Sequence, residues 1–449
     1  MNNIIQKFWT VGHERTLNIK KNILYSFLIK GLGILVGFIL VPLIINYVNT
    51  AQYGIWLTIY ALVAWVNTFD IGLSNGLRNK LAASIVLKED QNITRYVSTT
   101  YILLFFIALT TFVLFFIVGS FFDWNQLLKV GNTIDYKIWP VILITLGFFC
   151  IQFVLQPINS ILTATQQPFK SSLIFLAGQL LTLVITYILT LCTNGNLFIL
   201  VLVAAGCPAL SLLFGTLYFF RSGLKSFIPR FSTIDIKSAK NLLNLGGAFF
   251  LVQVGALILY ETDNIIITRT LGPSEVTTFN VAYKYFAILT IAFNIILTPY
   301  WNAFTEAYAK NDFSWIRQSI KKLRLIWLSG AILAVFLYLF SNIFYRIWVG
   351  DKIVVPNMLS LSLAIYVIVQ NWMVIHTYFL NGTGKLRIQL ILVISTGIIN
   401  IPLSVLLINH VGISGTVIAN VAVMLVMGIL FTYQSQLVIN RTATGIWNK

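Results

Sequence analysis

The chain consists of long apolar stretches separated by short polar breaks. A membrane span needs roughly 20 consecutive, mostly apolar residues, and twelve runs of about this length can be marked out in the 449 residues. They cover approximately 22–48, 53–75, 97–122, 137–160, 171–192, 197–220, 241–267, 277–303, 325–349, 357–380, 388–409 and 413–437. Runs such as ILLFFIALTTFVLFFIVG at 102–119 lack the two-residue alternation of a membrane β-barrel strand. The pattern predicts an all-α integral membrane protein with about 12 transmembrane helices.

A polar break at 221–240 divides the twelve runs into two sets of six. We therefore expect an N-terminal six-helix lobe over 1–220, a cytoplasmic linker over 221–240, a C-terminal six-helix lobe over 241–437 and a cytoplasmic tail over 438–449. A weak internal repeat supports the division, because NTAQYGIW from Asn49 and GPSEVTTF from Gly272 each join the first two helices of a lobe. An even number of spans in each repeat predicts parallel repeats, an arrangement that suits alternating access.

The distribution of charge gives the orientation. Only 10% of the residues are charged, against 58% hydrophobic, and the net charge is +17. With the N-terminus inside, 23 of the 30 Lys and Arg residues fall on the cytoplasmic side. The positive-inside rule therefore predicts that both termini are cytoplasmic, and it explains the net charge without a nucleic-acid partner. The three cysteines show no metal-binding or disulfide spacing, and no cleavable signal peptide is expected.

Lys30 is one of few ionisable residues inside the predicted spans. It lies about 12 Å from the inner end of the first helix, and Gly33 and Gly37 follow at the spacing of one helix face. Such a face can line a cavity or allow close helix approach. The alternative is that the Lys30 ammonium reaches the cytoplasmic headgroups along lipid.

An unusually polar stretch, FDIGLSNGLRNKLAAS at 69–84, ends the second predicted span. Asp70 lies near the inner end of that helix, Gly72 follows, and Arg78 supplies positive charge just beyond. Two interpretations remain open for this stretch. It can bind the substrate and couple or gate transport, or it can be a polar helix terminus followed by an amphipathic segment lying on anionic lipid.

A second acidic group lies in the seventh predicted span, where Glu261 and Asp263 precede the short turn to the eighth. Lys284 is about seven residues into the eighth span. Helices joined by a short turn are neighbours, so an ion pair between Asp263 and Lys284 is geometrically reasonable. A coupling or gating role and a purely structural pair are both consistent with this pattern.

Two stretches carry a family resemblance. FDIGLSNGLRNKLA at 69–82, with AQYGIWLTIYAL before it, resembles the second-helix region of the Wzx-type O-antigen and capsular polysaccharide flippases. ETDNIIITRTLGPSEVTTFNVAYK, from Glu261, is similar to the join between helices 7 and 8 of the same family. The resemblance implies a member of the multidrug, oligosaccharidyl-lipid and polysaccharide exporter superfamily, with two six-helix lobes around a central cavity.

The resemblance also implies a cargo and a mechanism. Such proteins move an undecaprenyl-diphosphate-linked oligosaccharide across the bacterial inner membrane by alternating access, for cell-surface polysaccharide synthesis. Cavity cations receive the diphosphate in related flippases, and by position this substrate-binding role falls to Lys30, Arg78 and Lys284. Asp70, Glu261 and Asp263 are the candidate coupling or gating residues. Membrane lipid and polysaccharide polymerase or ligase machinery are the other expected partners.

Two other classes of protein remain as alternatives. A drug or metabolite antiporter of the same superfamily would need a carboxylate near the membrane midplane, whereas the first helix offers Lys30. A membrane glycan polymerase or ligase would need catalytic acids or histidines in a large outer loop, but the longest outer loop, about 123–136, is small and the three histidines do not cluster. With no Walker A pattern, direct ATP hydrolysis is not supported. We expect a transporter rather than an enzyme, without a cofactor.

Overall fold

The computed structural model describes residues 14–70, 72–87, 89–131, 134–165, 167–235 and 262–448. Within these ranges the chain is helical apart from turns and short connections, and it contains no strand. Ten of the helices in the described ranges are long and apolar enough to cross a membrane. The all-α membrane architecture is therefore confirmed. Most of the seventh predicted span, 241–267, lies outside the described residues, as does Glu261.

The chain forms two compact units, and the first half of the sequence contributes to both. Unit 1 contains the described residues of Met1–Asn49, Val63–Asn125 and Asp135–Phe250. Unit 2 contains those of Thr50–Leu62, Gln126–Ile134 and Leu251–Lys449. Two segments from the first half of the sequence, Thr50–Leu62 and Gln126–Ile134, are therefore built into unit 2. We call them the exchanged segments.

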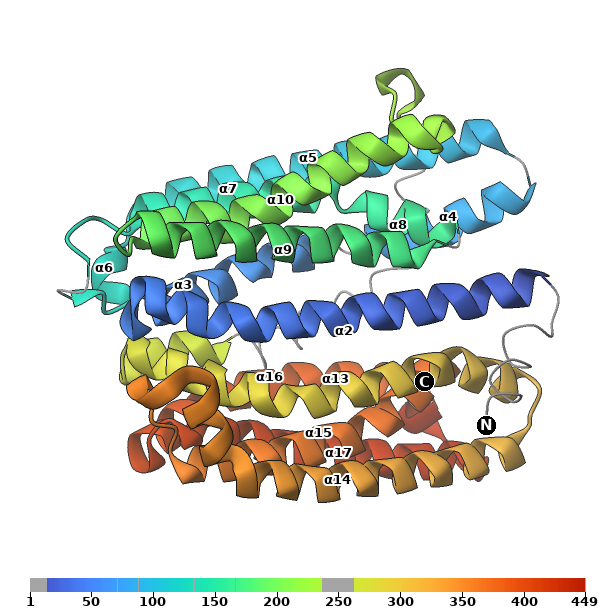
Figure 1. Cartoon of the computed structure of the whole chain (residues 1–449). Helices are drawn as coiled ribbons and strands as arrows, with labels where there is room; N and C mark the ends of the chain where they lie inside the picture. The colour runs from blue at the N-terminus through green and yellow to red at the C-terminus, as the bar shows by residue number, and fades with distance from the viewer. Residues whose placement is uncertain are drawn as a thin grey trace, which may run out of the picture. The chain divides into compact units, whose positions relative to one another are not determined.

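Unit 1 is a bundle of long helices with two short ones at one end. The long helices are α2 (Glu14–Val48), α5 (Asp90–Gly119), α7 (Trp139–Leu155), α9 (Pro168–Cys192) and α10 (Leu197–Ser222). The short ones are α4 (Leu73–Leu87) and α8 (Pro157–Ala164). In Figure 1, α5, α7, α9 and α10 run side by side, and α9 packs against both α2 and α10.

The second predicted span is not one continuous helix. The α-helix α3 (Thr50–Ala64) changes to the 3₁₀ helix η1 (Trp65–Asp70), and the chain then turns into α4. Gly72 makes this turn with φ of 78°, in the left-handed region that glycine adopts without steric cost. The predicted second span, roughly 53–75, therefore ends a few residues earlier than expected, at the polar stretch around Gly72.

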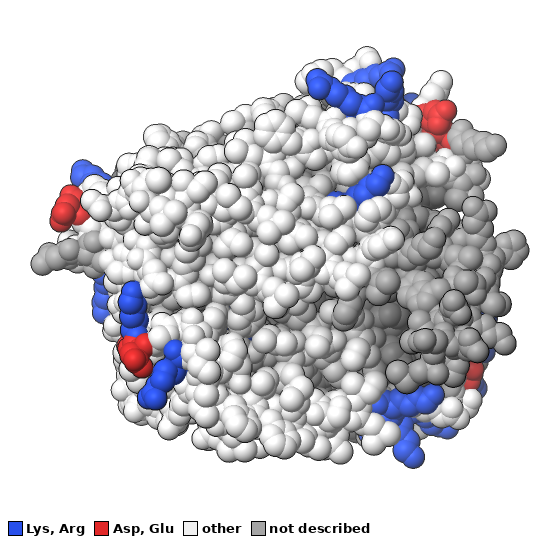
Figure 2. Space-filling view, viewed as in Figure 1, with Lys and Arg blue, Asp and Glu red and all other residues white. Residues whose placement is uncertain are grey.

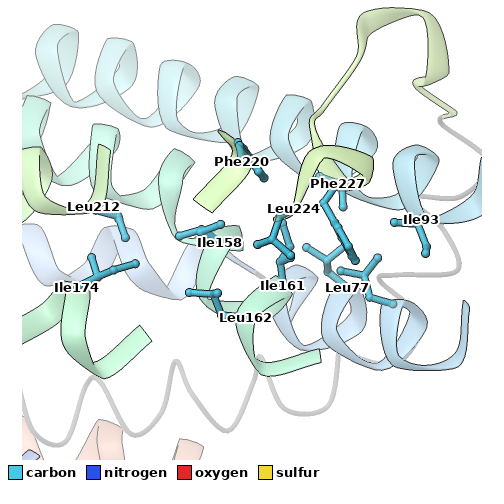
Figure 3. Close-up of a cluster of buried hydrophobic side chains, with 12 residues drawn as sticks. Leu77, Ile93, Ile158, Ile161, Leu162, Ile174, Leu212, Phe220, Leu224 and Phe227 are labelled. Atoms are coloured by element: carbon cyan, nitrogen blue, oxygen red, sulfur yellow. The ribbon is translucent and has the colours of Figure 1, made fainter. Parts of the chain in front are cut away.

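Helix α4 packs into a core at the end of unit 1 (Figure 3). Leu77 and Leu81 of α4 are fully buried against apolar side chains of α5, α8 and the segment after α10. Helix α4 thus covers unit 1 with its apolar face and keeps polar residues on the opposite side, as expected for an amphipathic helix.

Unit 2 is built around α15. Its long helices are α13 (Pro273–Ala309), α14 (Phe313–Val349), α15 (Asn357–Thr383), α16 (Arg387–Val411) and α17 (Ser414–Ile439), and a helical segment over 262–270 precedes α13. Helix α15 packs against α13, α14 and α17, and α16 packs against α17. The outer surface of α14 presents large apolar side chains such as Leu339 and Ile347. Lipid covers such a surface in a membrane-spanning helix.

The α3 portion of unit 2 is held by close contact with the start of α13. A Cβ atom at Gly54 would overlap the carbonyl oxygen of Pro273, so only glycine fits there. The Thr277 hydroxyl donates to the carbonyl of Thr50 at 2.6 Å, and the hydroxyls of Thr58 and Thr268 are 2.6 Å apart. The two turns that the internal repeat identifies as equivalent, NTAQYGIW and GPSEVTTF, therefore contact each other. The sequence comparison alone did not predict this contact.

The other exchanged segment is the loop after α6 (Trp124–Leu127). Its side chains Leu128 and Val130 are fully buried in unit 2. The Lys129 ammonium donates to the carbonyl of Thr270 at 3.1 Å, close to the end of the segment 262–270. Both exchanged segments thus hold the same short stretch of chain.

Candidate functional site

The three cations predicted to bind the substrate lie on three different helices. Lys30 of α2 and Arg78 of α4 belong to unit 1, and both side chains are exposed. Lys284 of α13 belongs to unit 2 and is half-buried. Their role in binding a phosphate group stays a prediction.

The glycines that accompany Lys30 behave differently from each other. A Cβ atom at Gly33 would lie 2.9 Å from the side-chain oxygen Oε1 of Gln179 on α9, whereas one at Gly37 would meet nothing within 4 Å. The atom at Gly33 is the end of a flexible side chain that can move away, so neither glycine is strictly required, and the role of this helix face stays a prediction.

Asp70 makes hydrogen bonds that account for an acid at this position. Its two carboxylate oxygens accept from the backbone N–H of Ser74, each at 3.2 Å, and Oδ1 also accepts from the Ser74 hydroxyl at 3.0 Å. The hydroxyl of Ser160 on α8 donates to the carbonyl of Ser74 at 2.9 Å. A carboxylate at a helix N-terminus satisfies free N–H groups and interacts favourably with the helix dipole. These contacts support a capping role for Asp70 at the start of α4.

Asp263 lies in a buried chain of polar side chains in unit 2. Its side chain is 3% exposed, and its Oδ2 accepts from the Asn420 amide at 2.6 Å. The Asn420 carbonyl oxygen in turn accepts from the Asn400 amide at 2.9 Å. The chain therefore links the segment 262–270 to α17 and α16 through side chains that are almost completely buried.

The series of hydrogen-bonded side chains ends on α16 at two buried oxygen atoms that make no hydrogen bond within the described part of the protein. The Asn400 oxygen Oδ1 and the Ser404 hydroxyl, one helical turn apart, make no hydrogen bond with any described residue, and both side chains are 0% exposed. A buried polar atom without a partner costs free energy, so such atoms usually belong to a functional arrangement or meet a bound group.

A further hydrogen bond connects this region to the helix that carries Lys284. The Asn280 amide on α13 donates to Oδ1 of Asn264 at 2.8 Å. Asn264 is the neighbour of Asp263 in the chain, and Asn280 is one turn before Lys284. The expected closeness of the seventh and eighth predicted helices is thus seen in this bond, while the specific pairing of Asp263 with Lys284 stays a prediction.

Sequence reasoning identified Asp263 but missed its asparagine partners. Asn400 and Asn420 are uncharged and stand alone within long apolar runs, so a search confined to ionisable residues passes over them. An amide in the middle of a membrane span is itself a signal, because it needs a partner there.

Comparisons with known proteins agree with this architecture. The model of the polysaccharide biosynthesis protein family matches residues 19–302. A protein of Yersinia pseudotuberculosis named for O-antigen export is 21% identical over 79% of this chain and 81% of its own length. The Bacillus subtilis membrane protein EpsK, named as uncharacterized, is 21% identical over 90% of this chain and 77% of its own length.

The fold is similar to that of solved multidrug transporters. An inward-facing multidrug resistance MATE family transporter of the MOP superfamily superposes with a TM-score of 0.73 at 15% identity, over 91% of this chain and 94% of its own. A second MATE structure, in complex with MaL6, gives a TM-score of 0.63 at 15% identity, over 94% of this chain and 97% of its own. The chain therefore has the fold of these transporters, and its ten long apolar helices in the described ranges agree with a multi-pass integral membrane protein.

The family match defines the protein more narrowly within that class. Because the matched region spans more than half of the sequence, the chain belongs to the polysaccharide biosynthesis protein family. The resemblance to Wzx-type polysaccharide flippases is confirmed by this match and by the relatives named for O-antigen export or transport. Those relatives are named for export or transport, and neither name mentions a polymerase or ligase.

Proposed function

We propose that the protein translocates an undecaprenyl-diphosphate-linked oligosaccharide from the inner to the outer leaflet of the bacterial inner membrane. Membership of the polysaccharide biosynthesis protein family is the observation that carries this proposal. A diphosphate and its sugars cannot cross the hydrocarbon core unaided, because unpaired polar groups there cost several kcal/mol each. The transporter would shield the headgroup while the polyprenyl tail stays in lipid.

Lys30, Arg78 and Lys284 are the proposed partners of the diphosphate. The exposed side chains of Lys30 and Arg78 are free to approach a bound headgroup, and the Arg78 guanidinium can form paired hydrogen bonds with a phosphate. Lys284 is half-buried, which strengthens its interaction with an anion relative to an exposed ammonium.

Alternating access would be coupled to the buried chain around Asp263. Asp263 and Thr268 lie on the same helical segment, about 7.5 Å apart along its axis. Thr268 contacts Thr58 of α3, and the carbonyl of Thr270 holds Lys129. Uptake of a proton or small cation at Asp263 would change its bond to Asn420, shift this segment and release the two exchanged segments. Glu261, two residues earlier in the chain, remains a second candidate for coupling.

One observation favours a second candidate function, a drug or metabolite antiporter of the same superfamily. The superposed structures are multidrug transporters, and Asp263 is a buried carboxylate of the kind that a cation-coupled antiporter needs. If the protein is a flippase, polysaccharide polymerase or ligase machinery would use the translocated oligosaccharide on the outer side of the membrane.

The test is to remove the gene and locate the lipid-linked oligosaccharide in the two leaflets. The flippase proposal expects a diphosphate-linked repeat unit to accumulate in the inner leaflet, with loss of surface polysaccharide. Normal surface polysaccharide together with altered sensitivity to cationic drugs would instead establish the antiporter.

Complementation with Lys30 variants tests the substrate site. Lys30→Ala should fail to restore surface polysaccharide at wild-type membrane levels of the protein, whereas Lys30→Arg, which keeps the charge, should restore most of it. Full activity of Lys30→Ala would show that this ammonium contacts lipid headgroups and not the cargo.

A further inference from the structure

The segment that follows α10 is fixed to unit 1 at several points. Leu224 and Phe227 are each 7% exposed and point into the core formed with α4, α5 and α8 (Figure 3). The Thr94 hydroxyl of α5 donates to the carbonyl of Ser226 at 3.0 Å. The Ser98 hydroxyl, also on α5, accepts from the backbone N–H of Arg230 at 2.8 Å. This part of the chain therefore has a defined position.

The end of the segment is held to the same helix. The Ser98 and Thr233 hydroxyls are 2.9 Å apart, and the Thr99 hydroxyl accepts from the backbone N–H of Asp235 at 3.1 Å. The Asp235 carboxylate lies 3.8 Å from the Arg95 guanidinium. We call residues 223–235 the pinned loop.

The tip of the pinned loop presents an apolar side chain among cations. Phe231 is 86% exposed although the backbone on both sides of it is fixed. Arg230 precedes it in the chain, and Arg230, Lys225 of the loop and Arg221 in the last turn of α10 are all exposed. Figure 2 shows Lys and Arg side chains gathered on the flank of unit 1 where the segment after α10 lies. An exposed aromatic side chain on a held backbone, with exposed cations in the same segment, is chemically matched to an anionic and partly apolar surface.

The lengths of the neighbouring helices place the loop at the membrane boundary. Helix α5 has 30 residues and is about 45 Å long, more than the roughly 30 Å hydrocarbon core. Its apolar run begins near Tyr101, so the turns that carry Thr94 and Ser98 lie in the headgroup layer. In Figure 1 the loop stands off the side of α5 and α10. A projection in this direction and at this depth meets lipid headgroups.

We infer that the pinned loop is a binding site for anionic phospholipid headgroups of the cytoplasmic leaflet. The Phe231 ring inserts at the level of the acyl-chain boundary, and Arg221, Lys225 and Arg230 bind headgroup phosphates. Aromatic side chains favour this boundary, and each cation near an anionic surface adds attraction. The interaction is independent of the cargo, and it fixes unit 1 against the leaflet.

A spin label at position 231 tests this site directly in the full-length protein. Phe231→Cys would be made with Cys192→Ser, because Cys192 is the exposed one of the three cysteines. The labelled protein would be placed in nanodiscs of phosphatidylcholine alone or with added phosphatidylglycerol. Collision with oxygen and with a nickel chelate would report the depth of the label. Phe121, 83% exposed at the other end of α5 and near Asp123 instead of cations, supplies the matched control position.

The expected result is a label at position 231 that lies deeper in discs containing phosphatidylglycerol. This dependence should be lost when Lys225→Gln and Arg230→Gln are added, while the label at position 121 shows no such dependence. A label at position 231 that stays accessible to nickel in both lipids would overturn the proposal and favour a soluble partner for the loop. Equal depth in both lipids would overturn the role of the cations.

Discussion

The interiors of the two units differ in the kind of polar side chain that they bury. Among the described residues of unit 1, every fully buried polar side chain except Asp70 carries only a hydroxyl group. Several of these hydroxyls donate to the backbone of their own helix, as Thr145 does to Val141 and Thr216 does to Leu212. Unit 2 buries amides, a histidine and a carboxylate as well, namely Gln370, Asn371, His376, Gln389, Asn400, Asn420, Gln434 and Asp263.

We interpret this difference as that between a scaffold, unit 1, and the part proposed to change state, unit 2. A hydroxyl bonded to its own helix needs no second helix and does not depend on how helices pack. An amide or carboxylate bonded to another helix ties the two helices together, so its protonation or occupancy alters their packing. The contrast supports unit 2 as the location of coupling, so substitutions in unit 2 should affect transport more than matched substitutions in unit 1.

The largest effect is expected from a crosslink at the contact of α3 with the segment 262–270. Thr58→Cys with Thr268→Cys should form a disulfide, because the two hydroxyls are already 2.6 Å apart. Oxidised protein should lose transport completely and regain it on reduction. The matched control in unit 1 joins α8 to α9 through Asn159→Cys and Ser171→Cys, whose side chains are in hydrogen-bond contact. It should leave transport unchanged, and equal activity of both crosslinked proteins would remove the distinction between the units.

Next in size is the effect of removing the buried charge of unit 2. Asp263→Asn keeps the size of the side chain but cannot bind a proton or cation in the same way. The rate of transport should fall by roughly 5- to 150-fold, which is the factor that corresponds to typical coupling free energies of about 1–3 kcal/mol. Asp70→Asn in unit 1 should retain most of the activity. Both variants are compared by their initial rates of transport at equal amounts of protein in the membrane. A larger loss in Asp70→Asn than in Asp263→Asn would place coupling in unit 1.

The asparagine partners should affect stability as well as transport. Asn420→Leu removes the donor to Asp263 and the acceptor of Asn400, so two buried polar groups each lose a hydrogen bond. The cost should be about 1–3 kcal/mol of the free energy of unfolding. Thermal unfolding in detergent measures this loss, and an unchanged midpoint would show that the chain contributes nothing to the packing of unit 2.

A smaller loss is expected from the cap of α4. Asp70→Ala removes the acceptor for the Ser74 N–H and hydroxyl and should cost about 0.5–2 kcal/mol of stability. Asp70→Ser, which restores a capping oxygen, should recover most of it. No loss in the alanine variant would mean that Asp70 does not stabilise this helix end.

The smallest effect should follow removal of a scaffold hydroxyl. Thr216→Val in α10 deletes a bond within the same helix and should change stability by less than about 1 kcal/mol. A loss as large as that of Asn420→Leu would contradict the comparison between the units.

The sequence predicted the helical membrane architecture because the composition of a span must match the lipid around it. The runs at 171–192 and 197–220 match α9 and α10 to within a few residues. The glycines and polar residues around Gly72 indicated that the second helix ends there, but the change from α-helix to 3₁₀ helix at Trp65 was not predicted. Nor does hydropathy show that Thr50–Leu62 packs with the second half of the chain.

The candidate site was predicted in part. An acid inside a span is costly, so Asp263 stands out in the sequence. Asn400 and Asn420 become significant only when the fold brings them to Asp263, because twenty or more residues separate any two members of the chain. The roles of Lys30, Arg78 and Lys284 depend on a bound cargo, which the sequence does not contain.

The most direct test of the account is a transport assay with purified protein in vesicles. Undecaprenyl-diphosphate oligosaccharide would be placed in one leaflet, and its appearance in the other would be followed under an imposed proton or sodium gradient. The account predicts gradient-stimulated translocation by the wild-type protein and none above background with the oxidised Thr58→Cys, Thr268→Cys protein. Translocation that proceeds equally with the crosslink in place would contradict alternating access through this contact, and no translocation by the wild-type protein would contradict the flippase function.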